Sequence, residues 1–188
     1  VQSGKNIETV FQTAGTISNY GLRKNEKSIY VITNEWSKDF KDIEKKEEEP
    51  LYYENLPFHF DSVGIIFNKR SHVYKVNLVT KKYTTIINGD KENIISIDSL
   101  VEHKNSITLS YSKYNTAGTM LEECVGAVKN KSIDNIFQKG SIGNLFYYED
   151  TLHGVGLRNR FDWPTNPTIL KFSTPGNASY KYKLFDRN

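Results

Sequence analysis

The chain has 188 residues, with 25 basic and 22 acidic side chains, a formal net charge of +3 and a mean hydropathy of −0.57. This length can bury a core without covalent cross-links, and the single cysteine, Cys124, excludes an internal disulfide framework. The small, scattered charge excess argues against nucleic acid as a partner. No apolar run is long enough for a transmembrane helix.

The chain begins with the polar stretch VQSGKN. Such a start is typical of a disordered linker (residues 1–8) after a processed signal or lipid anchor, and equally of a chain trimmed at a domain edge. We expect one β-rich domain over residues 1–188, most simply from a bacterial protein. We expect it to be secreted or held at the cell envelope, and a lipid anchor upstream of the chain fits this start.

Several segments alternate apolar and polar residues at a period of two, which is typical of strands with one buried face. These segments are 28–33, 62–68, 72–78, 106–114, 144–150, 168–174 and 179–185. Turn-forming residues separate some of them, notably at 88–90 and 175–178. The many tyrosines and phenylalanines, 12 and 10, also favour a β-rich protein.

The stretch HVYKVNLVTKKYTTII, residues 72–87, predicts a hairpin of two strands hinged at residues 80–82. In its first strand, Tyr74, Val76 and Leu78 share one face, and Lys75 and Asn77 lie on the other. We interpret this hairpin as architecture without chemistry.

Three segments suggest helices instead. Residues 37–50 are densely charged and end at a proline, which fits a short amphipathic helix or a charged loop. In 118–130, Thr119 precedes Glu122 by three residues, as in a capping box, and apolar residues fall on one helical face. Residues 132–140 begin with Ser132 and end with Gly140, which suit a helix start and stop.

A repeat is the alternative architecture. The strand–turn–strand segments at 29, 73 and 168 recur at intervals of about 44 to 48 residues or twice that, the length of a β-propeller blade. The stretch at 72–87 resembles the outer hairpin of a blade in TolB-like bacterial propellers, and this resemblance implies a small β-propeller-like repeat. The helical pattern at 118–137 falls where a blade would have strands.

We therefore predict a mainly β fold with one or two short helices. It is arranged as a β-sandwich, a barrel or a mixed sheet, with the small β-propeller-like repeat as the alternative.

Known catalytic motifs are missing from the sequence. HGVGLRN at 153–159 has two glycines but Asn159 in place of a third, so a dinucleotide site is unsupported, and no P-loop or nucleophile elbow occurs. The four histidines are isolated, and the pair His59 and Asp61 is better explained as polar residues beside a turn than as metal ligands. We expect no metal and no cofactor.

Two kinds of catalytic side chain remain. Cys124 lies among apolar residues, where a buried, inert thiol is the better interpretation than a nucleophile. Asp150, Asp162 and Glu35 lie near aromatic residues or His153, and paired carboxylates of this kind could hydrolyse glycosidic bonds.

Aromatic residues at strand ends and in loops offer the best candidate recognition surface. The loop LRNRFDWP at 157–164 is the densest polar and aromatic stretch. For each aromatic residue a role in packing is the competing interpretation. The predicted ligand-binding residues are Trp36, Tyr148, Arg158, Arg160, Asp162 and Trp163.

The leading functional hypothesis is a non-catalytic, extracytoplasmic recognition module for protein or carbohydrate. The first alternative is a carbohydrate-active hydrolase with paired carboxylates. The second is a cytosolic protein of the inhibitor or immunity type.

Overall fold

The structure, a computed structural model, describes residues 8–22, 27–37, 59–60, 64–65, 69–138, 140–157, 168–172 and 182–184. Within these ranges the chain forms strands β1 to β14 and one helix of a single turn, α1. The predicted mainly β class with a short helix is confirmed. The described residues contain no helix that is long and apolar enough to cross a membrane.

Most strands form three antiparallel sheets of four strands each. The first sheet, in the order β1-β2-β5-β6, consists of Thr16–Leu22, Ser28–Trp36, Lys69–Asn77 and Tyr83–Ile87. The middle sheet contains β7 to β10, which are Ile94–His103, Ser106–Tyr114, Leu121–Lys129 and Ser132–Phe137. The third sheet contains β11 to β14, which are Ile142–Tyr148, Thr151–Gly156, Thr168–Phe172 and Tyr182–Leu184.

Three small elements lie in the connections that leave β2 and β6 of the first sheet. The short strands β3 (His59–Phe60) and β4 (Gly64–Ile65) pair with each other between β2 and β5 in the chain. Helix α1 (Gly89–Glu92) links β6 to β7, at the turn that the sequence predicts around residues 88–90. Asn88 caps this helix by accepting a hydrogen bond from the Asp90 N–H at 3.0 Å.

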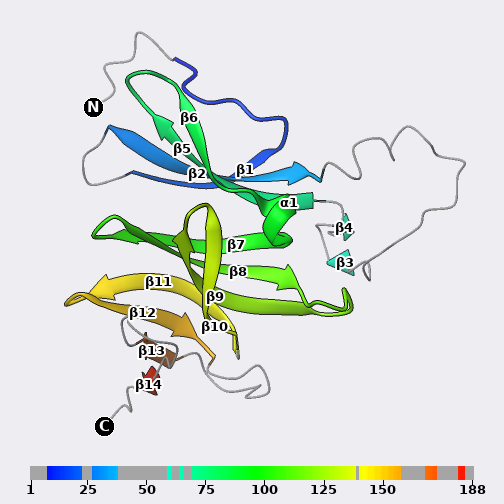
Figure 1. Cartoon of the computed structure of the whole chain (residues 1–188), viewed down its shortest axis with the longest axis vertical. Helices are drawn as coiled ribbons and strands as arrows, with labels where there is room; N and C mark the ends of the chain where they lie inside the picture. The colour runs from blue at the N-terminus through cyan, green and yellow to red at the C-terminus, as the bar shows by residue number, and fades with distance from the viewer. Residues whose placement is uncertain are drawn as a thin grey trace, which may run out of the picture.

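The three sheets are stacked face to face (Figure 1). Two clusters of buried side chains hold the stack together, one on each face of the middle sheet. The first cluster joins residues such as Ile32 and Val73 of the first sheet to Leu109 and Cys124 of the middle sheet. The second joins Val125 and other middle-sheet residues to the third sheet.

Strand β8 shows how the middle sheet is buried on both faces. Leu109 and Tyr111 lie in the first cluster, as the predicted alternation requires. The opposite face, which carries Thr108 and Ser110, is equally buried because it faces the third sheet. There the Thr108 hydroxyl lies 3.3 Å from the Tyr147 hydroxyl, and Ser110 donates to a backbone carbonyl of β11. These cross-sheet hydrogen bonds satisfy the polar groups that the stack removes from water.

The predicted helices at 118–130 and 132–140 are wrong, because these segments form β9 and β10. Neighbouring residues of β9 are buried against different sheets: Cys124 in the first cluster and Val125 in the second. A strand buried on both faces loses its polar alternation, and its continuous apolar run resembles a helix segment. Of the two residues that suggested a capping box, Thr119 belongs to a turn, in which Asn115 accepts from the Thr119 N–H at 2.9 Å, and Glu122 lies in β9.

The sheets recur along the chain, but not at the predicted intervals. The segments at 29 and 73 are β2 and β5, which pair within the first sheet and therefore do not begin successive repeats. Each large sheet is a four-stranded antiparallel meander, and successive meanders follow one another along both the chain and the stack. None of the sheets in the described part of the chain closes into a barrel. Strands β9 and β10, for which the sequence pattern indicated helices, complete the middle sheet.

Some predictions concern segments outside the described residues. They are the charged segment 37–50 beyond Ser37, the turn 175–178, and the parts of 62–68 and 179–185 beyond β4 and β14.

The two glycines of HGVGLRN serve packing. Both lie on β12, where a side chain on Gly154 would come within 2.4 Å of the Ile142 side chain. A side chain on Gly156 would come within 1.9 Å of the Ser141 carbonyl oxygen. Their spacing therefore reflects the close approach of β11 to β12.

Three hairpins share one turn geometry. Lys104 and Asn105, Asn130 and Lys131, and Glu149 and Asp150 each form a two-residue connection in which both residues have positive φ. Such turns suit the twist of paired strands, but glycine and asparagine adopt them more readily than lysine or glutamate.

Replacing Lys131 by glycine is therefore expected to stabilise the protein by about 0.5–1 kcal/mol, because glycine adopts its φ of 66° without a steric cost. Lys131→Ala is the matched control, since it removes the same side chain but keeps the Cβ atom. Urea unfolding measures both variants. Equal stability of the two would show that the turn backbone is not strained.

Candidate functional site

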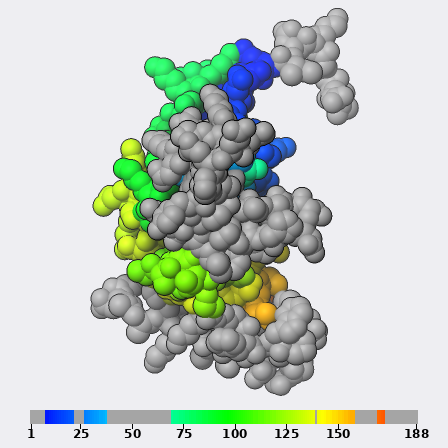
Figure 2. Space-filling view, turned by 90° about the vertical axis from the view of Figure 1, so that its right-hand side faces the viewer, coloured from blue at the N-terminus to red at the C-terminus, as the bar shows by residue number. Residues whose placement is uncertain are grey.

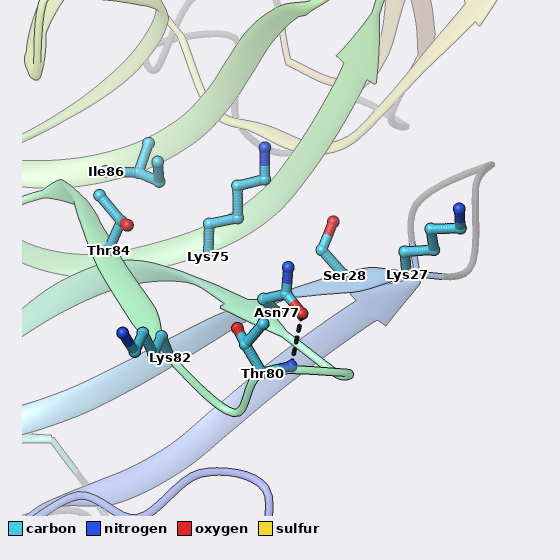
Figure 3. Close-up of a pocket in the computed structure, with 8 residues that line it drawn as sticks. All are labelled: Lys27, Ser28, Lys75, Asn77, Thr80, Lys82, Thr84 and Ile86. Atoms are coloured by element: carbon cyan, nitrogen blue, oxygen red, sulfur yellow. Dashed lines mark hydrogen bonds between the residues drawn. The ribbon is translucent and has the colours of Figure 1, made fainter.

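A cleft of about 620 Å³ opens beside the β5–β6 hairpin (Figure 3). We call it the lysine cleft. Its lining residues come from the start of β2, the end of β5 and the beginning of β6, and they are Lys27, Ser28, Lys75, Asn77, Thr80, Lys82, Thr84 and Ile86.

Backbone pairing brings these residues together although they are distant in sequence. Ser28 pairs with Asn77 across β2 and β5, and Lys75 pairs with Thr84 across β5 and β6. Because side chains alternate along a strand, Lys75 and Asn77 lie on the same face as Val73, which belongs to the first core cluster. The cleft is thus the polar continuation of the face that packs on the middle sheet.

The hairpin turn orients Asn77. Its side-chain oxygen accepts hydrogen bonds from the Val79 and Thr80 N–H groups, both at 2.9 Å. Its backbone N–H donates to the Lys82 carbonyl at 2.9 Å, which places Lys82 beside it. Because the amide oxygen is engaged within the turn, Asn77 offers its NH₂ group, a donor, to the cleft. Figure 3 shows this nitrogen turned away from Thr80.

The charged residues of the lysine cleft that the structure describes have one sign. They are Lys27, Lys75 and Lys82, and none of the described lining residues is acidic. Lys81, in the same turn, forms an ion pair with Glu8 and is not part of the lining. A concave surface with three ammonium groups focuses a positive potential, which attracts anions.

The opposite face of the first sheet is covered by residues 8–15. Figures 1 and 2 both show this segment (blue) beside the β5–β6 hairpin (green), at one end of the stack. The Phe11 ring lies 5.4 Å from the rings of both Tyr74 and Tyr83, measured between centroids. This covering segment supports the strands that carry the cleft.

Glu35 anchors that segment through three hydroxyl groups. One of its carboxylate oxygens accepts from Thr13 at 2.7 Å, from Thr33 at 2.8 Å and from Tyr74 at 3.1 Å. Burial raises the pKa of Glu35, but these hydrogen bonds and the nearby His72 outweigh it, and the pKa lies below its usual range. Glu35 is therefore a structural anion at neutral pH rather than a proton donor.

Replacing Glu35 by glutamine is expected to remove a pH-dependent part of the stability. A carboxyl whose pKa is lowered by folding stabilises the protein above its unfolded-state pKa, and this contribution is lost as the pH falls through the folded-state pKa. Wild type should thus exceed Glu35→Gln in unfolding free energy at pH 7, and the difference should shrink below about pH 4. A difference that stays constant from pH 7 to pH 3 would contradict this.

The predicted ligand-binding residues are described only in part. Trp36 ends β2 and is half-buried, with the Lys69 ammonium nitrogen 5.2 Å from its ring centroid. Tyr148 ends β11 and is 62% exposed. The ends of these two strands lie at opposite sides of the stack (Figure 1), so the structure does not bring the two residues together. Arg158, Arg160, Asp162 and Trp163 lie outside the described residues, and the binding role of all six stays a prediction.

The candidate carboxylates fall into two environments. Asp150 lies in the β11–β12 turn, and hydrogen bonding by Lys104, with His103 2.8 Å away, holds its pKa below the usual range. Asp98 retains an exposed surface, but partial burial, and then the charge of Glu123, raise its pKa. The sequence interpretation did not identify the pair Asp98 and Glu123, because the two residues come near each other only through the pairing of β7 with β8 and of β8 with β9.

Cys124 is buried in the first core cluster, and burial raises its pKa to about 11. A thiol in this state is a poor nucleophile, which agrees with the inert role expected from the sequence. Within the ranges given above, no three histidine, cysteine, aspartate or glutamate side chains gather as a metal ion would require.

The residues of the lysine cleft were missed by the sequence interpretation. Lys75 and Asn77 had been assigned to the polar face of a strand, which is an ordinary pattern. The signal that could have identified them is the cluster of lysines on both sides of the 78–80 turn, together with the absence of acidic residues from 70 to 89.

No family model and no curated protein sequence matches this chain. Among solved structures, the chain is similar to the acylaminoacyl peptidase of Pyrococcus horikoshii, with a TM-score of 0.61 and 10% sequence identity. The match covers 87% of this chain and 25% of that one. At this identity the likeness concerns the fold alone.

Proposed function

We propose that this protein is a recognition module that binds an anionic group of a protein or carbohydrate in the lysine cleft. The observation that carries the proposal is that Lys27, Lys75 and Lys82 line one concave surface and that no described lining residue is a carboxylate. Their positions are set by the pairing of β2, β5 and β6, so the cleft is formed before a ligand arrives. Preorganised charge of this kind favours binding because few side chains have to be ordered when the ligand binds.

The chemistry of the cleft also favours binding over catalysis. Ammonium, hydroxyl and amide groups line it, and none of the described lining residues is a histidine, a carboxylate or a thiol. A general acid or base within reach of the ligand is thus lacking among them.

Isothermal titration calorimetry with dextran sulfate, carboxymethyl dextran, polyglutamate and uncharged dextran tests this function. We expect binding to at least one polyanion and none to uncharged dextran, with an affinity that falls as salt is added. The Lys82→Gln variant should lose about tenfold in affinity, and Lys81→Gln, one residue away but outside the lining, should lose little. If no polyanion binds, or if both variants bind as wild type does, the proposed function is wrong.

A carbohydrate-active hydrolase is the second candidate, and Asp98 favours it. Burial and the charge of a second carboxylate, Glu123, raise the pKa of Asp98, and a raised pKa is one property of the general acid in glycosidic hydrolysis. Release of reducing sugar from a panel of polysaccharides, lost in Asp98→Asn, would support a hydrolase. Hydrolysis that is unchanged in this variant would exclude this pair.

The location outside the cytoplasm is part of the proposal. The gene sequence upstream of Val1 tests it, since a secretion signal or lipid-attachment motif is expected there.

A further inference from the structure

We propose that Asn88 is a self-modification site, at which the chain converts asparagine to isoaspartate when the junction between the first and middle sheets opens. This inference does not depend on the lysine cleft. Asn88 and Gly89 form the one Asn-Gly pair in the sequence. They lie where helix α1 connects β6 of the first sheet to β7 of the middle sheet.

The reaction needs only the chain and water. The backbone nitrogen of Gly89 loses its proton to solvent and attacks the side-chain amide carbon of Asn88, which closes a five-membered succinimide ring. The amide nitrogen takes up a proton from solvent and leaves as ammonia. Water then opens the ring at either carbonyl group, giving aspartate or isoaspartate. Glycine favours the attack because no side chain shields its nitrogen and its backbone is permissive.

In the folded protein both reacting groups are engaged. The Gly89 N–H donates to Nδ1 of His72 at 3.2 Å, so the nitrogen keeps its proton. The side-chain oxygen of Asn88 accepts from the Asp90 N–H at 3.0 Å, which fixes this side chain in its capping position. Gly89 and His72 are both buried, so a base in solution has no direct access to the proton. The folded junction therefore suppresses the reaction.

The closed junction has no room for the product. A side chain on Gly89 would come within 2.1 Å of the Ser71 carbonyl oxygen, so the two backbones are in close contact there. The Ser71 hydroxyl donates to the Ile95 carbonyl at 3.1 Å, which ties β5 to β7 at the same place. Isoaspartate lengthens the backbone at residue 88 by a methylene group, so Gly89 cannot return to this position. Opening followed by modification is thus a one-way event.

Mass-spectrometric peptide mapping during incubation at mildly alkaline pH tests the inference. The full chain is kept in native buffer and, in parallel, in concentrated urea. We expect isoaspartate at Asn88 to form more than about 100-fold more slowly in the folded chain, because the reaction waits for the junction to open. This wild-type comparison needs no variant, so it tests the proposal even if a substituted chain fails to fold.

Two histidine variants separate local from global protection. His72→Ala removes the acceptor of the Gly89 N–H and should raise the rate in native buffer about tenfold. His153→Ala removes a buried histidine of β12, in the third sheet, and should leave the rate within about threefold.

Three outcomes would overturn the proposal. Equal rates in native buffer and in urea would show that the junction does not protect the site. A folded His72→Ala chain that reacts no faster than His153→Ala would show that His72 does not hold the Gly89 N–H. Finally, the modified chain, diluted from urea, should not regain slow amide exchange at Ile87 and Ile94, which are fully buried on either side of α1. Full recovery of that protection would contradict the one-way step.

Discussion

Replacing Lys75 and Lys82 together by glutamate is expected to lower the affinity for the anionic ligand by more than about 100-fold. Hydrogen bonds to a charged partner contribute about 1.5–3 kcal/mol each, and about 1.4 kcal/mol corresponds to tenfold in affinity. The double variant removes two such contacts and adds two repulsive charges within the lysine cleft. Neither side chain belongs to a core cluster, so the variant should fold.

A second double variant, Lys81→Glu with Lys131→Glu, provides the control. It changes the net charge by the same amount, but neither residue lines the cleft. If binding depends on local contacts, this variant should keep its affinity within about threefold, because neither side chain lines the cleft and exposed surface charges are screened by salt. Equal losses in both double variants would show that overall charge, rather than the cleft, governs binding.

The second large effect concerns the middle sheet. Replacing Leu109 by alanine is expected to reduce the free energy of unfolding by about 3 kcal/mol, within the range of 2–5 kcal/mol seen for buried leucines. Leu109 is fully buried between the first and middle sheets. The stacked sheets on either side limit how far the surroundings can collapse into the cavity, which keeps the cost high.

Urea unfolding measures this effect, with Val79→Ala as its control. Val79 lies in the β5–β6 turn and is 75% exposed, so its truncation should change stability by less than about 0.5 kcal/mol. A cost for Leu109→Ala as small as that of Val79→Ala would mean that the two sheets do not pack as described.

The sequence predicts correctly that residues 72–78 form a strand, because apolar and polar residues alternate there. Tyr74 and Lys75 lie on opposite faces of the first sheet. Lys75 shares the face of Val73 in the first core cluster, and Tyr74 faces the covering segment 8–15, so the pattern does not show which face meets the core. The turn at residues 88–90, which follows β6, is also marked locally, by Asn88 and Gly89. No knowledge of distant residues is needed for either signal.

The middle sheet could not be predicted in this way. Residues 121–137 are strands only because two other sheets cover both of their faces, and those sheets come from residues far away in the chain. From sequence alone, Cys124 and Val125 are neighbours in an apolar run, and their burial in different core clusters is a property of the stack.

The candidate site was hidden for a related reason. Lys27 and Lys75 are nearly 50 residues apart in the chain, and strand pairing places both in the lining of one cleft. No local sequence motif indicates that pairing. The sequence favoured aromatic residues instead, of which Trp36 and Tyr148 prove to lie on different sheets.

The central claim is that the lysine cleft is where this protein binds an anion, and amide chemical shifts test it most directly. During titration of ¹⁵N-labelled protein with a sulfated dextran oligosaccharide, the amides of Ser28, Lys75, Asn77 and Lys82 are expected to shift together and to saturate at one affinity. Shifts confined to other lysines, such as Lys104 in the β7–β8 turn, with the cleft amides unchanged, would contradict the claim.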